Sequence, residues 1–217
     1  MVNSRHFRSN TYNDIKEELP VAKTIDYYFS PVSPWTYLGH ARFQEIARKH
    51  GATVVPKPVD YGRIFPLSGG LPVTKRPPQR QAYRLVELER WRKHLGVPLN
   101  IQPKFFPYDA KLAALAIIAT GDVDKAMTLT AAFLRGCWAE EKNMADEAEV
   151  AAAIRVAGLD SGALLKQAKA PETVARFESF TDEAIARQVF GAPTYVYRNE
   201  LFWGQDRLEF LDRALEK

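Results

Sequence analysis

The sequence of 217 residues contains a single cysteine, Cys137. One thiol cannot form an internal disulfide, a Cys-x-x-Cys redox pair or a four-cysteine zinc site, so the sequence excludes these three kinds of site. The cysteine usage also favours a reducing, cytoplasmic environment. Neither the four histidines nor the acidic residues show the spacing of metal ligands, and we therefore expect no metal.

Long apolar runs are absent as well. No stretch of about 18 apolar residues exists, so we expect no membrane span. Residues 1–22 carry charges and lack the apolar core of a secretory signal, and we interpret them as an N-terminal extension. Thirty basic and 26 acidic residues give a formal charge of +4 and are mixed along the chain, which disfavours a nucleic-acid partner.

The order of the expected elements indicates the fold. A β-branched and aromatic run over 24–29 predicts a central strand, a helical stripe over 35–50 follows it, and 53–59 resembles a second strand. Near the C-terminus, 194–197 and 200–203 read as a hairpin around Arg198 and Asn199, followed by a closing helix over 206–215. A βαβ start and a ββα finish therefore flank the middle of the chain.

The middle of the chain is predicted to be helical. Residues 62–78 are rich in Gly and Pro and read as a loop, and a helix is expected over 79–95. Between Asp109 and Gln188 nearly every segment has helical periodicity and none is a convincing strand. We predict an α/β protein, divided into the N-terminal extension, a first sheet part, a large all-helical insertion and a second sheet part, at 1–22, 23–66, 67–177 and 178–217.

Ser33 stands at the start of the first predicted helix, directly before Pro34. Serine is a preferred N-cap and proline is favoured at the first helical position, so the pair has a complete structural explanation. The same position also favours a functional role, because the free N–H groups of a helix N-terminus stabilise an anion such as a thiolate. No histidine lies nearby as a base, so Ser33 is better suited to donate a hydrogen bond than to attack.

Three linked motifs carry a resemblance to a known family. The chain is similar to the 2-hydroxychromene-2-carboxylate isomerase family, which is related to the kappa-class glutathione transferases and shares the DsbA-like thioredoxin fold. The resemblance runs from about Thr24 to the C-terminus and includes Leu88-Glu89-Arg90-Trp91 of the middle helix. Its three motifs are Tyr28-Phe29-Ser30-Pro31-Val32-Ser33-Pro34-Trp35-Thr36-Tyr37-Leu38-Gly39, Val189-Phe190-Gly191-Ala192-Pro193-Thr194 and Leu201-Phe202-Trp203-Gly204-Gln205-Asp206-Arg207.

The resemblance implies a glutathione site. Ser33 matches the catalytic serine that contacts the glutathione sulfur, at the position of the redox cysteine in related folds. Pro193 matches the cis-proline of thioredoxin folds, and the backbone of Ala192 would pair with glutathione. A loop at the start of the last helix would hold the γ-glutamyl end, with the Asp206 carboxylate near its ammonium group. That loop consists of Trp203, Gly204, Gln205 and Asp206.

Residues of the insertion and one residue of the first predicted helix are candidates for binding the substrate. Arginines in or after the Gly/Pro-rich loop suit a substrate carboxylate, although exposed loop charges are usually only solvated. Two tyrosines are either hydroxyl donors or packing residues. These candidates are Tyr37, Arg80, Tyr83 and Arg84, with Lys75 and Arg76 as neighbours. Family members commonly carry a Thr-Gly-Asn-x-Pro-like stretch where this chain has Ser68-Gly69-Gly70-Leu71-Pro72, and Asp60-Tyr61-Gly62-Arg63 replaces a more apolar segment. These departures bear on the substrate and leave the glutathione motifs intact.

The activity that the resemblance implies is a glutathione-dependent isomerisation of an aromatic 2-oxo acid. The expected pair is 2-hydroxychromene-2-carboxylate and trans-o-hydroxybenzylidenepyruvate or a similar compound, in a cytoplasmic homodimer. One alternative is a kappa-like transferase or peroxidase. The other is a non-catalytic thioredoxin-fold module that binds peptides or thiols. A disulfide oxidoreductase is excluded, because Ser33 and Thr36 cannot form a disulfide.

Overall fold

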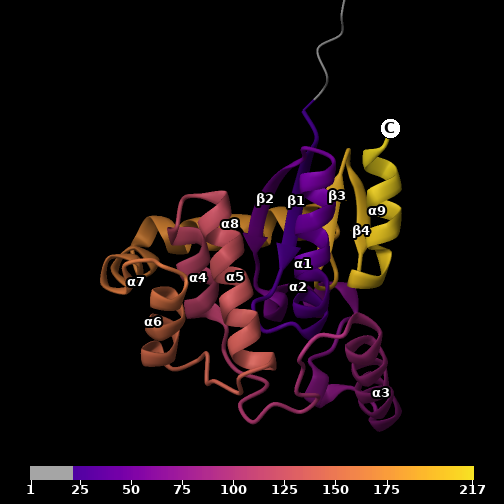
Figure 1. Ribbon diagram of the computed structural model, residues 1–217, viewed down its shortest axis with the longest axis horizontal. Coiled ribbons are helices and arrows are strands. Elements are labelled where there is room, and N and C mark those ends of the chain that lie inside the picture. Colours follow the sequence, from indigo (N-terminus) through magenta and orange to yellow (C-terminus); the bar gives the residue numbers. More distant parts are fainter. Residues whose placement is uncertain (1–21) are drawn as a thin grey trace, which may run out of the picture.

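A four-stranded mixed sheet lies at the centre of the molecule, which a computed structural model describes for residues 22–217 (Figure 1). The strand order is β2-β1-β3-β4. β1 runs parallel to β2, and β3 runs antiparallel to both β1 and β4. The strands are β1 (Thr24–Phe29), β2 (Thr53–Pro58), β3 (Thr194–Tyr197) and β4 (Glu200–Trp203). The predicted strands and hairpin are confirmed, whereas the extension expected over 1–22 lies outside the described residues except for position 22.

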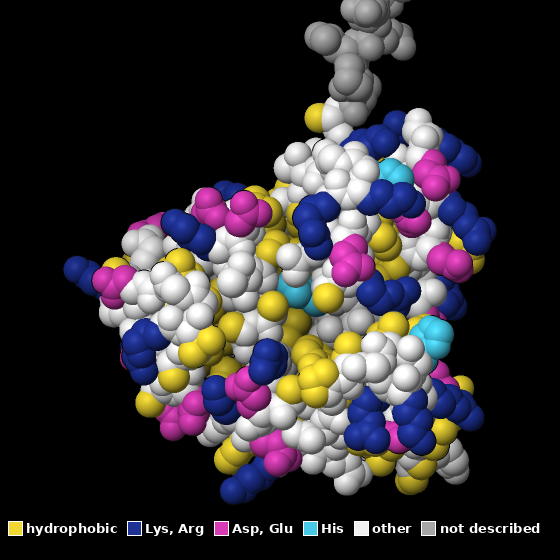
Figure 2. Space-filling model, in the orientation of Figure 1, with side chains coloured by type: hydrophobic (Ala, Val, Ile, Leu, Met, Phe, Trp, Pro, Cys, Tyr) yellow, Lys and Arg dark blue, Asp and Glu magenta, His cyan; other side chains and the backbone are white. Residues whose placement is uncertain are grey.

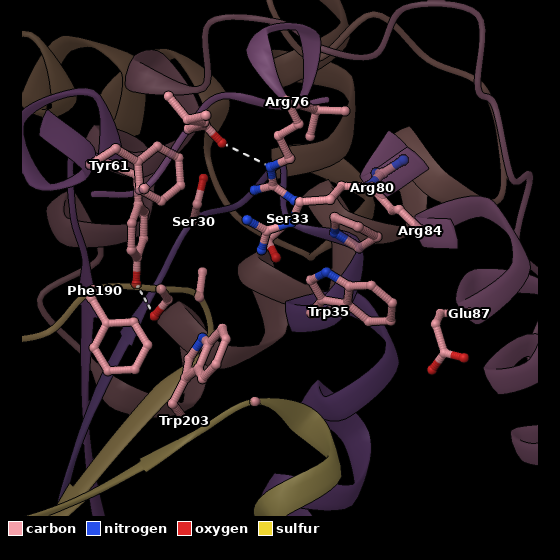
Figure 3. A pocket seen from close by; sticks show the side chains of 18 of the residues that line it. Ser30, Ser33, Trp35, Tyr61, Arg76, Arg80, Arg84, Glu87, Phe190 and Trp203 are labelled. Atoms are coloured by element: carbon pink, nitrogen blue, oxygen red, sulfur yellow. Dashed lines mark hydrogen bonds between the residues drawn. The ribbon is translucent and has the colours of Figure 1, made fainter. Parts of the chain in front are cut away.

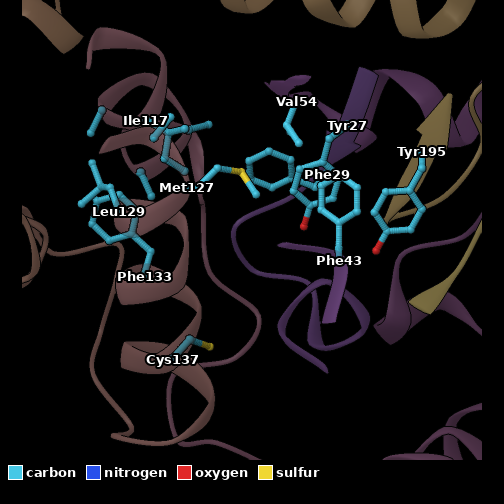
Figure 4. Close-up of a cluster of buried hydrophobic side chains, with 14 of the residues drawn as sticks. Tyr27, Phe29, Phe43, Val54, Ile117, Met127, Leu129, Phe133, Cys137 and Tyr195 are labelled. Atoms are coloured by element: carbon cyan, nitrogen blue, oxygen red, sulfur yellow. The ribbon is translucent and has the colours of Figure 1, made fainter. Parts of the chain in front are cut away.

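Alternate side chains of β1 point to opposite faces of the sheet. Because these side chains are apolar on both faces, helices cover both faces. Tyr27 and Phe29 belong to the larger core, with Phe43 of α1 (Pro34–Lys49) and Leu211 of α9 (Leu208–Leu215) (Figure 4). Tyr28 belongs to a second cluster on the other face. That face is covered by α2 (Tyr61–Ser68) and α8 (Pro171–Ala186). β1 is therefore buried on both sides, as the prediction of a central strand requires.

The helical insertion predicted between the two sheet parts is confirmed. Four of its helices gather beside β2, and α3 lies apart from them, below the sheet in Figure 1. Their breaks fall near Gly121 and Gly158 and at Pro171. The helices are α3 (Pro78–Leu95), α4 (Lys111–Ala119), α5 (Val123–Trp138), α6 (Glu147–Val156) and α7 (Ser161–Ala168). The structure thus has the predicted βαβ start and ββα finish around a large helical insertion.

The prediction of a loop over 62–78 is wrong. Most of its first half is α2, and a 3-10 turn, η1 (Val73–Lys75), follows. The helix forms despite Pro66 because both of its ends are capped. The Asp60 side chain accepts a hydrogen bond from the Gly62 N–H at 2.7 Å, and Gly69 ends the helix with a φ of 72°. The boundaries proposed at 66/67 and 177/178 fall inside α2 and α8.

Acidic and basic side chains are interspersed over the face shown in Figure 2. This arrangement agrees with the mixed charges of the sequence. Within residues 22–217, no helix is both long enough and apolar enough to cross a membrane.

Candidate active site

A cavity of about 840 Å³ lies where the first turn of α1, the end of the sheet, α2 and α3 meet (Figure 3). Its volume is in the range of small-molecule sites. The structure brings three distant segments together at this cavity, as the three linked motifs predict. The predicted site residues that line it are Ser33, Arg80, Tyr83, Arg84, Ala192, Trp203, Gly204, Gln205 and Asp206.

Ser33 caps α1, and its side chain faces the cavity. Its Oγ accepts a hydrogen bond from the Thr36 N–H at 3.2 Å, and Pro34 occupies the first helical position. The N–H of Tyr37 bonds to the carbonyl of Ser33, which leaves the N–H of Trp35 as the further donor of this turn. Because Oγ acts as acceptor in the cap, its own proton is free to donate to an anion in the cavity.

The Ala192-Pro193 peptide bond is cis, as the resemblance implies. The carbonyl of Gly191 accepts hydrogen bonds from the Tyr61 hydroxyl at 2.9 Å and the Thr194 hydroxyl at 2.6 Å. The carbonyl of Pro193 accepts one from the Gly204 N–H at 2.9 Å. These bonds fix the backbone on both sides of Ala192, which itself lines the cavity, whereas Pro193 is buried behind it.

Trp203 and Phe190 form one wall of the cavity, opposite the arginines (Figure 3). Their ring centroids are 4.7 Å apart. Gly191 is required beneath this wall, because a Cβ atom at that position would collide with the indole ring of Trp203. The Trp203 side chain still exposes 51% of its surface, so it is available to contact a ligand.

The loop that begins η2 (Gln205–Arg207) presents one carboxylate at the cavity. Gly204 adopts a φ of 100°, which favours glycine. Gln205 is buried, and its side-chain oxygen accepts a hydrogen bond from Arg42 at 2.9 Å, so its side chain positions the loop. Asp206 remains exposed and forms an ion pair with Arg207 at 2.6 Å. Asp206 therefore brings a negative charge to the cavity, whereas the Gln205 side chain is bonded within the protein.

Three arginines line the opposite side of the cavity. Arg84 is buried, with only 7% of its surface exposed. Its guanidinium lies 4.9 Å from the ring centroid of Phe106 and 5.7 Å from that of Trp138. Burial and the neighbouring Arg76 lower the pKa of Arg84 to about 10. Burial and Arg80 likewise lower the pKa of Arg76. The cavity therefore contains closely spaced positive charge on the α3 side.

Of the tentative substrate residues, Tyr37 lies away from the cavity and Tyr83 lies at its rim. Tyr37 does not line the cavity, because its hydroxyl donates to the carbonyl of Pro98 at 2.6 Å and ties α1 to the segment after α3. The structure therefore places Tyr37 in a packing contact and not among the residues that line the cavity. Tyr83 lies on the rim, where its side chain is 58% exposed. Lys75 is exposed and outside the cavity lining.

Cys137 packs in the core inside α5 (Figure 4). Burial raises the pKa of its thiol to about 12, which makes it a poor nucleophile. Within the described residues, no three His, Cys, Asp or Glu side chains gather as a possible metal site.

Sequence reasoning missed most of the aromatic lining of the cavity. Trp91 and Glu87 continue the face of α3 that begins at Arg80 and Arg84. Spacing of three and four residues places these side chains on one face of a helix, so this signal was present in the sequence. Other lining residues without a predicted role are Trp35, Tyr61, Phe65, Phe106 and Phe190.

Comparisons with known proteins agree with the fold and the motifs. The family model for the DsbA-like thioredoxin domain matches residues 24–216. A 2-hydroxychromene-2-carboxylate isomerase of Sphingobium xenophagum is 31% identical over 196 residues, covering 90% of this chain and 99% of that protein. A solved structure of a 2-hydroxychromene-2-carboxylate isomerase has a TM-score of 0.77 and 27% identity, covering 89% of this chain and 94% of the other. Glutathione S-transferase kappa 1 of Caenorhabditis elegans is 22% identical, covering 92% of this chain and 93% of that protein.

The fold and the family model define the protein as a DsbA-like thioredoxin domain. Within that class, the chain belongs to the 2-hydroxychromene-2-carboxylate isomerase family. The family resemblance and the assignment to an isomerase type of enzyme are thereby confirmed. The stretch 68–71, where the sequence departs from the common family pattern, lines the cavity.

Proposed function

We propose that the protein is a glutathione-dependent cis-trans isomerase of an aromatic 2-oxo acid. The two compounds that it would interconvert are 2-hydroxychromene-2-carboxylate and trans-o-hydroxybenzylidenepyruvate, or a similar pair. The observation that carries the proposal is the convergence of Ser33, Ala192 and Asp206 on one cavity. The names of the relatives support the isomerisation, and the kappa-class relative supports the use of glutathione. When bound, glutathione supplies a thiolate that adds reversibly to a conjugated double bond and so permits rotation.

Ser33 and the first turn of α1 would stabilise the negative charge on sulfur. The hydroxyl donates directly, and the Trp35 N–H and the positive end of the helix act on the same region. Both effects favour the ionised form of a thiol and lower its pKa. The serine itself undergoes no covalent change in this proposal.

The residues around the cis-proline fit a tripeptide. Neighbouring carbonyls are already bonded, so the backbone of Ala192, which lines the cavity, is the edge available for pairing with a peptide. Asp206 offers a carboxylate to the γ-glutamyl ammonium at the other side of Trp203. This combination suits glutathione, because a plain thiol requires neither contact.

The test follows the ultraviolet spectrum of trans-o-hydroxybenzylidenepyruvate with the enzyme, in the presence and absence of glutathione. We expect a spectral change that requires glutathione, while the total glutathione concentration stays constant. If the wild-type enzyme produces no glutathione-dependent change, the proposed substrate pair is wrong. A Ser33→Ala variant that retains the wild-type rate would contradict the role given to that serine.

The kappa-like transferase remains the second candidate because of the kappa-class relative. The two reactions differ in their products. An isomerase regenerates glutathione, whereas a transferase consumes one glutathione for each electrophile conjugated. Measuring free thiol during complete turnover of the substrate therefore separates them.

The proposal also includes the homodimer and the cytoplasmic location implied by the resemblance and the cysteine usage. Sedimentation of the full chain at several concentrations tests whether the protein is a homodimer. A particle of 24.6 kDa at all concentrations would contradict the homodimer.

A further inference from the structure

Arg84 is a buried cation without an anionic partner in the described part of the chain. Its side chain is among the few buried polar ones, and its Nη2 atom is both buried and without a hydrogen-bond partner. A buried, unpaired donor on a charged group is costly, and native structures normally satisfy it. The cost is removed when an anion accepts the free N–H groups.

The carboxylates that share the cavity are already paired with other residues. Glu87, one turn along α3, accepts a hydrogen bond from Arg90 at 2.6 Å. Asp206 pairs with Arg207 on the opposite side of the cavity. Neither acid forms an ion pair with Arg84 among residues 22–217. The missing anion is therefore expected from a ligand.

The guanidinium of Arg84 is held rigidly against aromatic rings. Phe106 and Trp138 lie under it, and the two rings also pack on each other with centroids 4.8 Å apart. Contact with aromatic faces orients the planar guanidinium while leaving its edge for a carboxylate. A hydrogen bond between the charged guanidinium and a carboxylate is stronger than one between neutral groups.

The surroundings of Arg84 favour a flat ligand. Trp35 and Trp91 line the same cavity. Trp35 lies near Ser33 and the arginines (Figure 3). Aromatic side chains stack favourably on planar conjugated groups. The cavity thus offers aromatic surfaces and one buried cation close to the thiol-binding end of α1.

We propose that Arg84 binds the carboxylate of the second substrate and thereby selects flat unsaturated acids over neutral electrophiles. Arg76 adds positive charge nearby and is itself held by a bond from its Nε to the carbonyl of Leu71 at 2.8 Å. Arg80 is exposed and lies closer to solvent. This inference rests on the proposed function, because that function identifies the reaction in which the acid takes part. The binding of the acid to Arg84 does not depend on that reaction.

The experiment measures the binding of trans-cinnamate to the full chain without glutathione, by calorimetry and by tryptophan fluorescence. Cinnamamide, which has the same shape without the charge, serves as the matched ligand. We expect wild-type protein to bind the acid about 10- to 100-fold more tightly than the amide, the range expected for a charge-assisted hydrogen bond. Equal affinities would overturn the proposal.

Variants assign this preference to Arg84. Arg84→Met should abolish the preference for the acid, and Arg84→Lys should retain part of it because the charge remains. Lys75→Met removes a positive charge from the neighbouring turn outside the cavity and should behave as the wild type. If Arg84→Met does not fold, the Arg84→Lys variant still decides, since an unchanged ratio of acid to amide affinity contradicts a contact with the Arg84 guanidinium.

Glutathione provides the last arm of the experiment. Saturating glutathione should leave the affinity for cinnamate within about twofold, because the two ligands would occupy different parts of the cavity. Competition between them would assign Arg84 to a carboxylate of glutathione and overturn the proposal. Binding of cinnamate without any isomerase activity would instead retain this site and refute the proposed reaction, so the two failures are distinguishable.

Discussion

Gly39 of α1 lies directly against Gln205 of η2. A Cβ atom built on Gly39 would be 2.7 Å from the Cβ of Gln205 and 3.2 Å from the hydroxyl oxygen of Tyr195. This contact is possible only without a side chain, and it joins the helix that carries Ser33 to the loop that carries Asp206. The two ends of the proposed glutathione site are therefore positioned by one glycine.

Replacing this glycine should disturb both stability and binding. For Gly39→Ala we expect a net loss of about 1–2 kcal/mol, because overpacking outweighs the better helix propensity of alanine. The KM for glutathione should rise because η2 moves away from α1. Urea unfolding and steady-state kinetics measure the two effects.

Gly162 in α7 provides the matched control for Gly39. Its Cβ would meet only the Asp160 side chain at 3.5 Å, so Gly162→Ala should be neutral or slightly stabilising. Equal stability of the two alanine variants would contradict the tight contact at Gly39.

Ser33 combines a structural and a chemical role that two substitutions separate. Aspartate is as good an N-cap as serine, so Ser33→Asp should keep the stability of α1. Its carboxylate cannot donate to a thiolate and repels it, and the rate should fall by about 100-fold or more. Ser33→Ala should lose about 1 kcal/mol of stability together with the donor.

Comparing these two variants shows whether Ser33 acts only as a helix cap or also in catalysis. Thermal unfolding and the isomerase rate are measured for both. If activity followed stability across the two variants, Ser33 would be a helix cap only.

Asp206 should act in binding more than in the chemical step. Asp206→Asn removes the negative charge and should raise the KM for glutathione by about tenfold with a smaller change in kcat. Glu209→Gln removes a charge from the neighbouring turn of α9, outside the cavity lining, and serves as the control. A fall in kcat at unchanged KM would place Asp206 in the reaction itself.

The fold was predictable where local signals agreed with one another. The run from Thr24 to Phe29 is β-branched and aromatic, and Ser33-Pro34 marks the start of α1, so strand and helix were both clear. α2 was missed because Gly62 and Pro66 are common in loops. Asp60 and Gly69, which flank this helix, were its signals in the sequence. Recognising them requires giving more weight to capping residues than to the Gly and Pro content of the segment.

The sequence predicted which motifs form the candidate site, but it did not show which of the candidate residues face the cavity. Tyr37 stands four residues after Ser33, yet its side chain turns toward Pro98, a contact 61 residues away in sequence. Arg84 was one of several basic candidates, and only burial against Phe106 distinguishes it from Arg80. Such long-range contacts decide which residues of a helix face a cavity, and local sequence does not contain them.

Asp212 of α9 joins the end of α1 to the C-terminal helix, and its pairing should appear in the acid stability. Its carboxylate contacts the His50 ring at 2.6 Å and the Lys49 ammonium at 2.9 Å. These two contacts, His50 first, lower the pKa of Asp212 below its usual value of 3.8. A carboxyl group with a lowered pKa in the folded state contributes stability above its unfolded pKa, and that contribution disappears as the pH falls through the folded pKa.

Asp212→Asn should therefore destabilise the protein near neutral pH and have progressively less effect below about pH 4. Because the site is partly exposed, we expect a difference of only about 0.5–1 kcal/mol at pH 7. Urea unfolding of both proteins between pH 3 and pH 7 measures it. A difference in unfolding free energy that stays constant over this range would mean that the Asp212 charge does not contribute, and that the asparagine acts through packing alone.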